Sequence, residues 1–188
     1  ATYYGRVRAV NGDGLPTAYA YAAAPAATGV LLPAGSAGGL SGAALGTSSI
    51  TWSWTSGSVA GADFFSLYSA PGVPLATAPF SASASFTQTG LGANTGHVLL
   101  VAGANANGSG PLAVSATVYT LAQAPAAPAA AVALSSAVLT LGLNGNSAGT
   151  TLQLWRSADN VSFANIYEGE SLSYPDGELA ECSVYYYK

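Results

Sequence analysis

Three segments of this chain carry one short pattern at intervals of about 90 residues, and this repetition limits the fold more than any other feature. Residues 2–11 read Thr-Tyr-Tyr-Gly-Arg-Val-Arg-Ala-Val-Asn, and related patterns occupy residues 96–105 and 184–188. When Tyr3, His97 and Tyr185 are taken as equivalent, the spacings are 94 and 88 residues (97 − 3 and 185 − 97). Such a period matches a small two-sheet β-sandwich of roughly 100 residues.

The first copy alternates with period two. Val7 and Ala9 fall on the same side as Tyr3, whereas Arg6 and Arg8 fall on the other side. This is the pattern of a half-buried β-strand. The sequence Asn-Gly-Asp-Gly follows at residues 11–14, and Asn and Gly suit the positive φ angles of a tight turn. The first copy therefore predicts a strand that enters a hairpin.

Other segments of the middle and last copies alternate in the same way. We find no long segment in which apolar residues recur at the helical period of 3.6. The chain is therefore predicted to be all-β. The expected core of the middle copy consists of the apolar positions on three strands: Ile50, Trp52, Trp54, Phe65, Leu67, Leu99 and Val101. The corresponding positions of the last copy are Leu139, Leu141, Leu143, Leu152 and Leu154.

The order of these residues resembles strand F of fibronectin type III domains. The pattern is a Leu, a Thr four residues later, an aromatic position six residues later, alternating apolar residues and an Asn; here it is Leu91, Thr95, His97, Leu99, Val101 and Asn105. Trp54-Thr55 is similar to the core tryptophan region of strand B, and residues 154–163 and 174–177 are similar to later regions of bacterial members. The resemblance implies tandem immunoglobulin-like (fibronectin type III) antiparallel β-sandwiches.

Two positions depart from the family pattern. Leu143 stands where the last copy should have the strand B tryptophan, and His97 stands where the family has a corner tyrosine. In the family, the phenol of that tyrosine bonds to the backbone of the preceding loop. We expect a ring nitrogen of His97 to make the equivalent bond.

The repeats divide the chain into three expected parts. Residues 1–22 would be the F and G strands of a preceding repeat, residues 23–124 a complete repeat, and residues 125–188 a repeat that stops within strand F. The Ala- and Gly-rich residues 22–46 are expected to be a long connection before strand B, with extra residues packed along a neighbour.

A sandwich without its F and G strands would expose an apolar interior and an unpaired edge. We expect adjoining polypeptide to supply the missing strands. A tandem array is the simpler source. Donation by another copy is the alternative, but residues 1–6 and 183–188 would then compete for one place in the sheet.

Charged residues are very rare. Only 6% of residues are Asp, Glu, Lys or Arg, and Asp63 is the single charged residue between Asp13 and Arg156. A surface with so little charge lacks the repulsion that keeps proteins apart in a crowded cytosol. We therefore expect an extracellular or cell-surface protein, covered by neighbours or by glycans. Four basic residues against eight acidic ones disfavour nucleic acid. No apolar run reaches the roughly 18 residues of a membrane-spanning helix.

The residues that could perform catalysis are few and have structural explanations. His97 and Asp63 would each occupy a strand or turn position, and no nucleophile-elbow sequence accompanies a serine. Cys182 has no basic neighbour in sequence to activate its thiol, and we expect its side chain to be partly buried. We therefore predict that the chain is not an enzyme and has no catalytic residues.

No metal or cofactor site is predicted. The acidic residues near the C-terminus match no EF-hand spacing, and residues 11–14 form a turn rather than a calcium loop. That acidic cluster comprises Glu168, Glu170, Asp176, Glu178 and Glu181. Two sequons make Asn107 and Asn160 candidate glycosylation sites. Several tyrosines are expected to be exposed and could form contacts between repeats: Tyr4, Tyr19, Tyr21, Tyr119 and Tyr186.

Three classes of function are compatible with these features. The first is a structural array of repeats in a surface or filament protein, whose partners are neighbouring repeats or copies of the same protein. The second is an adhesin or ligand-binding module, and the third is a spacer in a secreted carbohydrate-active enzyme. Tandem repetition and low charge favour the structural array. The loop at residues 105–110 is short and has no aromatic residue, which disfavours a binding module.

Overall fold

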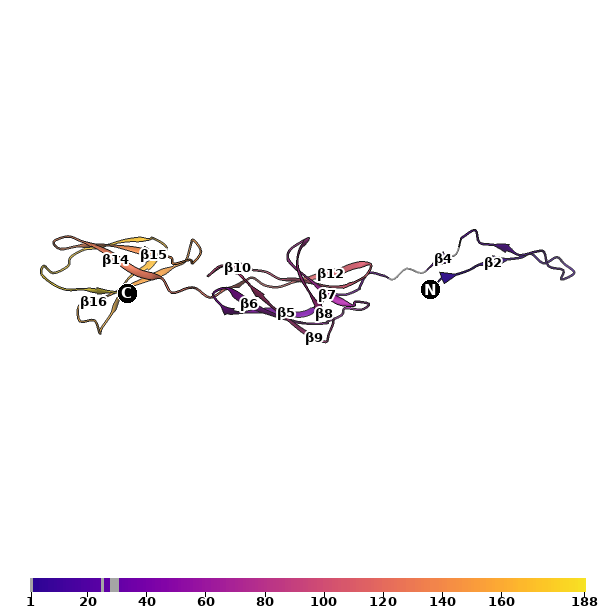
Figure 1. The fold of residues 1–188 in the computed structure, drawn as a ribbon, viewed down its shortest axis with the longest axis horizontal. Helices are drawn as coiled ribbons and strands as arrows, with labels where there is room; N and C mark the ends of the chain where they lie inside the picture. Colours follow the sequence, from indigo (N-terminus) through magenta and orange to yellow (C-terminus); the bar gives the residue numbers. More distant parts are fainter. Residues whose placement is uncertain (1, 25, 28–30) are drawn as a thin grey trace.

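The computed structural model describes residues 2–24, 26–27 and 31–188, and these residues form β-strands without any helix. Figure 1 shows an elongated arrangement with a hairpin at one end and two sandwiches beyond it. The prediction of an all-β fold built from antiparallel sandwiches is confirmed. We call the sandwich of β5–β13 the middle repeat and the sandwich of β14–β19 the last repeat.

The N-terminal hairpin (residues 2–24) has no sandwich around it. Strand β1 (Thr2–Tyr3) pairs with β4 (Ala26–Ala27), and β2 (Arg6–Val7) pairs with β3 (Ala20–Tyr21). The backbone pairing thus reaches five residues beyond the expected boundary at residue 22. Every residue from 2 to 24 is exposed. The hairpin therefore lacks the apolar partner that stabilises most hairpins. An isolated pair of strands is at best marginally stable in water.

The middle repeat contains two packed sheets. The first consists of β5 (Gly38–Gly46), β6 (Ser49–Thr55) and β9 (Ser83–Thr89) in the order β5-β6-β9. The second has the order β12-β11-β7-β8 and consists of β7 (Phe64–Ala70), β8 (Val73–Pro79), β11 (Leu100–Asn105) and β12 (Gly108–Val114). The short strands β10 (Gly96–His97) and β13 (Val118–Tyr119) pair with each other.

The predicted core of the middle repeat is confirmed. All seven residues are at most 2% exposed, and they share one hydrophobic cluster. The Trp54 ring packs edge-on against Phe65, with 5.6 Å between centroids. The two tryptophans differ in their polar atoms. The Trp52 Nε1 donates to the Gln88 side chain at 3.0 Å, whereas the buried Trp54 Nε1 has no partner.

The expected long connection at residues 22–46 contains a strand, so this part of the prediction is wrong. Residues 38–46 form β5 and pair with β6 along nearly its whole length. The Gly- and Ala-rich composition hid this strand because the inward positions contain no large apolar residue except Leu40. A small residue is needed there: a Cβ at Gly42 would lie 2.4 Å from the Trp52 ring.

The last repeat has a first sheet like that of the middle repeat, but its second sheet is smaller. Strands β14 (Ala126–Val132), β15 (Ala137–Gly142) and β18 (Ser173–Asp176) form one sheet. Strands β16 (Leu152–Ser157), β17 (Ala164–Gly169) and β19 (Tyr186–Tyr187) form the other, in the order β17-β16-β19. Its core contains Leu139, Leu141, Leu152 and Leu154, with Leu143 packed against it.

The corner position differs between the two repeats. In the last repeat, the Tyr185 hydroxyl accepts a hydrogen bond from the Ala180 N–H at 3.1 Å. In the middle repeat, the His97 Nε2 lies 2.7 Å from the Thr95 hydroxyl, which itself donates to the Gly92 carbonyl. The expected backbone bond of His97 is therefore wrong. The imidazole is shorter than a phenol, and Thr95 bridges the remaining distance to the loop.

Candidate interaction surfaces

The junction between the two sandwiches is a polar contact. Ala93 of the middle repeat forms a parallel bridge with Asn146 of the last repeat, and the Ser147 N–H donates to the Ala93 carbonyl at 3.3 Å. The Asn94 amide donates to the Thr150 hydroxyl at 2.9 Å. Asn94 has a φ of 50°, a left-handed conformation that asparagine tolerates better than most residues.

Asn146 binds the peptide that joins the two repeats. Its Oδ1 accepts from the Gln123 N–H at 2.7 Å, and its Nδ2 donates to the carbonyls of Gln123 and Leu143 at 2.8 and 2.7 Å. The Asn144 amide donates to the Ala124 carbonyl at 2.8 Å. Asn146 is only 7% exposed, and its bonds to Gln123 and Leu143 satisfy its buried amide.

The junction bonds can fix the direction of one repeat relative to the next. They come from a loop of the middle repeat, the linker and a loop of the last repeat, so rotation about the linker would break several together. A neutral hydrogen bond contributes about 1 kcal/mol, and an unpaired buried amide costs more. No residue between Gly14 and Trp155 except Asp63 is charged, so salt has little effect on this junction.

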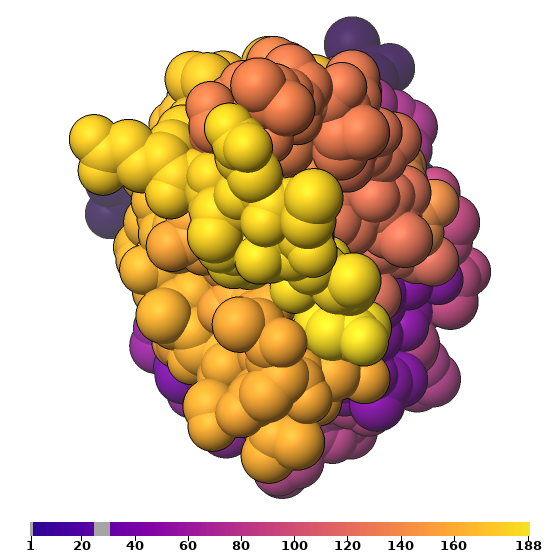
Figure 2. All heavy atoms as spheres, turned by 90° about the vertical axis from the view of Figure 1, so that its left-hand side faces the viewer, coloured from indigo at the N-terminus to yellow at the C-terminus, as the bar shows by residue number. Residues whose placement is uncertain are grey.

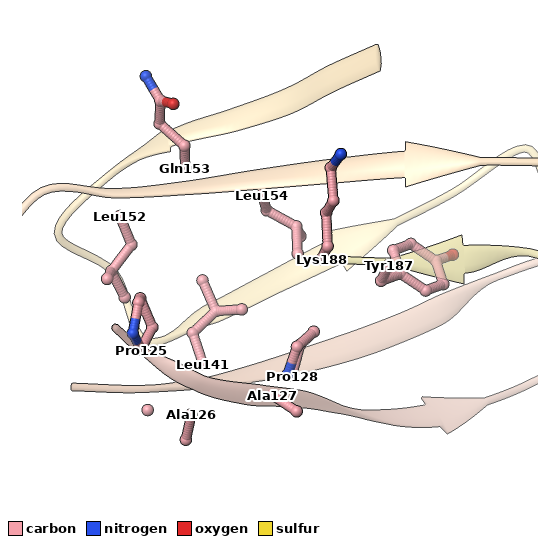
Figure 3. Close-up of a pocket in the computed structure, with 11 residues that line it drawn as sticks. Pro125, Ala126, Ala127, Pro128, Leu141, Leu152, Gln153, Leu154, Tyr187 and Lys188 are labelled. Atoms are coloured by element: carbon pink, nitrogen blue, oxygen red, sulfur yellow. The ribbon is translucent and has the colours of Figure 1, made fainter. Parts of the chain in front are cut away.

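A second surface is an apolar groove of about 420 Å³ in the last repeat. Leu141, Leu152 and Leu154 point into it from two different sheets, as Figure 3 shows, whereas the Gln153 side chain points away. Pro125, Ala126, Ala127, Pro128, Gly142, Gln153, Tyr187 and Lys188 complete its lining.

The groove lies beside an open part of β16. On one side, residues 152–156 pair with β17. On the other side, β19 reaches only residues 156 and 157, and Trp155 exchanges backbone hydrogen bonds with Lys188 at 2.9 and 3.0 Å. Within the described residues, no strand pairs with residues 152–154 on that side. Figure 2 views the last repeat from its outer end, with the C-terminal segment (yellow) on the surface.

A cluster of polar residues anchors β19 next to the groove. The Arg156 guanidinium forms an ion pair with Asp176 at 2.7 Å, and the Tyr187 hydroxyl donates to the same carboxylate at 2.8 Å. Burial, together with the hydrogen bond to Asp176, raises the pKa of Tyr187 to about 12. The Lys188 ammonium lies 3.9 Å from the centre of the Phe163 ring. The position of β19 is therefore well defined.

The candidate glycosylation residues both lie in exposed turns. Asn107 follows β11, and its N–H donates to the Asn105 side chain at 2.9 Å. Asn160 has a φ of 59° in the turn after β16. In that turn, N–H groups of Ser162 and Val161 donate to Asp159 and lower the pKa of its carboxyl to about 2. Exposure is compatible with glycosylation, which stays a prediction for both residues.

The residues considered for catalysis do not form a cluster in the described structure. His97 bonds with Thr95, and the Asp63 N–H donates to Ala104 at the start of β7. Cys182 is exposed with a φ of 58°, so the expectation that it is partly buried is wrong. It lies in a turn rather than on a strand, and a turn exposes its side chains.

The acidic cluster is likewise dispersed over the last repeat. Asp176 is buried and paired with Arg156, whereas Glu168 accepts from the Gln153 amide at 3.0 Å. No three potential metal ligands gather among the residues that the structure describes. The same residues include no helix that is long and apolar enough to cross a membrane.

Sequence reasoning missed the junction residues Asn94, Asn144 and Asn146. Asn-Gly-Asn at residues 144–146 reads as an ordinary turn, and a turn pattern does not reveal which distant backbone its side chains will reach. The groove was expected in general terms, from the missing strands, but its lining was not.

Comparisons with known proteins show the fold. No protein-family model matches the sequence, and no curated protein matches it. The chain is similar to a two-domain fibronectin type III segment of chicken tenascin, with a TM-score of 0.50 and 14% identity. The match covers 79% of this chain and 86% of that one. Other similar structures are a protein called FN3tt (TM-score 0.39, 14% identity, 48% and 97% coverage) and the FN1–FN3 domains of chicken CNTN1 (0.36, 13%, 98% and 68%). The chain thus has a fibronectin type III-like fold.

Proposed function

We propose that this fibronectin type III-like chain is a structural repeat segment of an extracellular surface or filament protein, in which the repeats form an extended array. Domains of this fold are commonly structural or adhesion modules of extracellular proteins. The fold alone does not determine a function, so the proposal depends on features of this chain.

The observation that carries the proposal is the hydrogen-bonded junction. Asn146 bonds to the linker, and Asn94 bonds across to Thr150. A module that only needed to be tethered could use a flexible linker. Fixed orientation between consecutive repeats is instead the property that a stalk or filament requires.

The low charge and the exposed turns support the same assignment. A nearly uncharged surface is suited to contact with neighbouring copies or to coverage by glycans, with Asn107 and Asn160 as acceptor residues. Neighbouring repeats or copies of the same protein are the proposed partners, and the proposed location is outside the cell or on its surface.

The experiment measures distances between spin labels placed on the exposed residues Ser85 and Ala164 of the full chain, with Cys182 replaced by Ser. We expect a narrow distance distribution, which Asn146→Ala broadens because the linker loses its bonds. The exposed Asn165 lies in the last repeat away from the linker bonds, so Asn165→Ala is the matched control and should leave the distribution narrow. A broad distribution in the parent chain would contradict the proposal.

A further inference from the structure

The N-terminal hairpin is built like the hairpin that completes the middle repeat. In the middle repeat, β11 and β12 meet at a turn where the Asn105 side chain accepts from the Asn107 N–H. In the N-terminal hairpin, the Asn11 side chain accepts from the N–H groups of Asp13 and Leu15 at 3.1 and 2.8 Å. One hairpin lies in a sheet, and the other is exposed along its whole length.

The middle repeat also shows which strand occupies the place that is open in the last repeat. There, Leu100 lies opposite Tyr68, and the next residue, Val101, lies opposite Leu67 with no exposed surface. In the last repeat, Trp155 corresponds to Tyr68 and bonds with Lys188, which corresponds to Leu100. The next residue of such a strand would lie opposite Leu154, at the floor of the groove.

The repeat alignment identifies the residues of the N-terminal hairpin that suit these positions. Because Tyr3 corresponds to Tyr185, Arg6 corresponds to Lys188. Val7 then falls opposite Leu154, and Ala9 falls opposite Leu152. Both side chains are apolar and on the same side of the strand, so both would point into the groove.

The other side of the same strand suits the outer surface of the last repeat. Arg8 would fall opposite Gln153, whose amide already donates to Glu168. The last repeat contains six carboxylates and two basic side chains, whereas the hairpin contains Arg6, Arg8 and Asp13. The charges of the two surfaces are therefore complementary.

We propose that the groove of the last repeat binds the N-terminal hairpin of a second copy, whose residues 7–10 extend the sheet beside residues 152–154 of β16. This is β-strand addition to an open edge. Each copy offers one hairpin and one groove, so the contact is heterologous and produces a head-to-tail polymer. The proposal rests on the proposed function, for which it names the partner and the contact.

The overlap between residues 1–6 and 183–188 is resolved in this arrangement. The acceptor keeps β19 through Tyr187 and Lys188, and the donor strand enters only where β19 ends. Donor residues before Arg6 then leave the sheet. Gly5 stands at this point of the chain, and a glycine allows the backbone to bend more freely than any other residue.

The test is sedimentation of the full chain over a range of concentrations. Val7 is 68% exposed, so Val7→Asp leaves both sandwiches folded but would place a carboxylate in the groove. We expect the parent to form chains of increasing mass and Val7→Asp to associate at least roughly 100-fold more weakly. Tyr4 is 82% exposed and lies before the donated residues, so the matched control Tyr4→Asp should assemble like the parent.

A peptide experiment separates donation by a second copy from other causes of association. The Val7→Asp chain serves as a monomeric acceptor, and titration calorimetry measures its binding of a synthetic peptide of residues 6–21. The parent peptide should bind, and the Val7→Asp peptide should not. The proposal is overturned if Val7→Asp assembles like the parent, if neither peptide binds, or if the parent chain stays monomeric with its own hairpin in its own groove. None of these results changes the spin-label distances, which test the proposed function separately.

Discussion

The middle and last repeats share one architecture but differ in how completely it closes. In the middle repeat, β11 pairs with residues 64–68 of β7, and Val101 and Ala102 are fully buried. In the last repeat, β19 covers only the end of β16, and three leucines line an open groove. One chain therefore contains both a closed sandwich and an open one, and we propose that the hairpin of a second copy closes the open one. Both repeats have the same apolar pattern, so the number of strands in the second sheet, rather than that pattern, distinguishes them.

The largest expected effect is in the closed core. Trp54 is 2% exposed and packs against Phe65, so Trp54→Ala should destabilise the middle repeat by about 3–5 kcal/mol. Denaturant unfolding of the full chain measures the change. Trp54→Phe is the sharper control, because it keeps an aromatic ring and removes an indole N–H that has no partner. A loss as large for Trp54→Phe as for Trp54→Ala would mean that the ring is not the source of the stability.

A core truncation in the open repeat should cost less. Leu154 is 1% exposed but borders the groove, so the cavity left by Leu154→Ala opens to solvent and water can fill it. We expect a loss of about 2 kcal/mol, at the low end of the range for leucine truncation. The loss should increase when the groove is occupied by the parent peptide of residues 6–21. If Leu154→Ala costs the same stability with and without the peptide, the proposed difference between the open and closed repeats is wrong.

The corner residues should produce a smaller difference. Tyr185→Phe removes the hydroxyl that bonds the Ala180 N–H and should destabilise the last repeat by about 1 kcal/mol. His97→Tyr should leave the stability of the middle repeat unchanged or raise it, because a phenol can reach the loop without Thr95 as a bridge. Thermal unfolding of both variants measures the two changes in stability. A clear loss of stability for His97→Tyr would show that the His97–Thr95 hydrogen bond stabilises the corner more than a tyrosine–loop bond does.

The smallest effect is a pH dependence confined to the last repeat. The pKa of Tyr187 is about 12 in the folded chain and 10.0 in an unfolded chain, so the unfolded state loses this proton first. The stability that Tyr187 contributes is therefore fully present below pH 10 and declines as the pH rises to about 12. Ultraviolet titration should show one late-ionising tyrosine, which Tyr187→Phe removes. If the late-ionising tyrosine is still present in Tyr187→Phe, the assignment of the raised pKa to Tyr187 is wrong.

The sequence predicted the strands in which large apolar and polar residues alternate. It did not predict contacts between residues that are far apart in the sequence. Ile50, Trp52 and Trp54 identify their strand because large apolar residues alternate with polar ones. Strand β5 was missed because Gly42 must be small to accept the Trp52 ring, and small residues carry little strand signal. The bonds of Asn146 to the linker connect residues 23 positions apart, which no local pattern encodes.

The exposed Cys182 shows a further limit of pattern reading. Its side chain was expected to be partly buried, but the chain takes a left-handed conformation there and turns before β19. The register of β19, in contrast, followed from the repeat itself: Lys188 occupies beside Trp155 the place that Leu100 occupies beside Tyr68. Internal repetition was therefore the more reliable guide to long-range pairing.

Amide hydrogen exchange at Gln153 tests the central claim most directly. The Trp155 N–H donates to Lys188. N–H groups two residues apart on a strand point to the same side, so the Gln153 N–H faces the open edge of β16. We predict fast exchange in the Val7→Asp chain and strong protection in the parent chain at concentrations where it assembles, with Tyr4→Asp behaving like the parent. Equal exchange at Gln153 in the parent and in Val7→Asp would contradict the claim that a second copy's hairpin completes the last repeat.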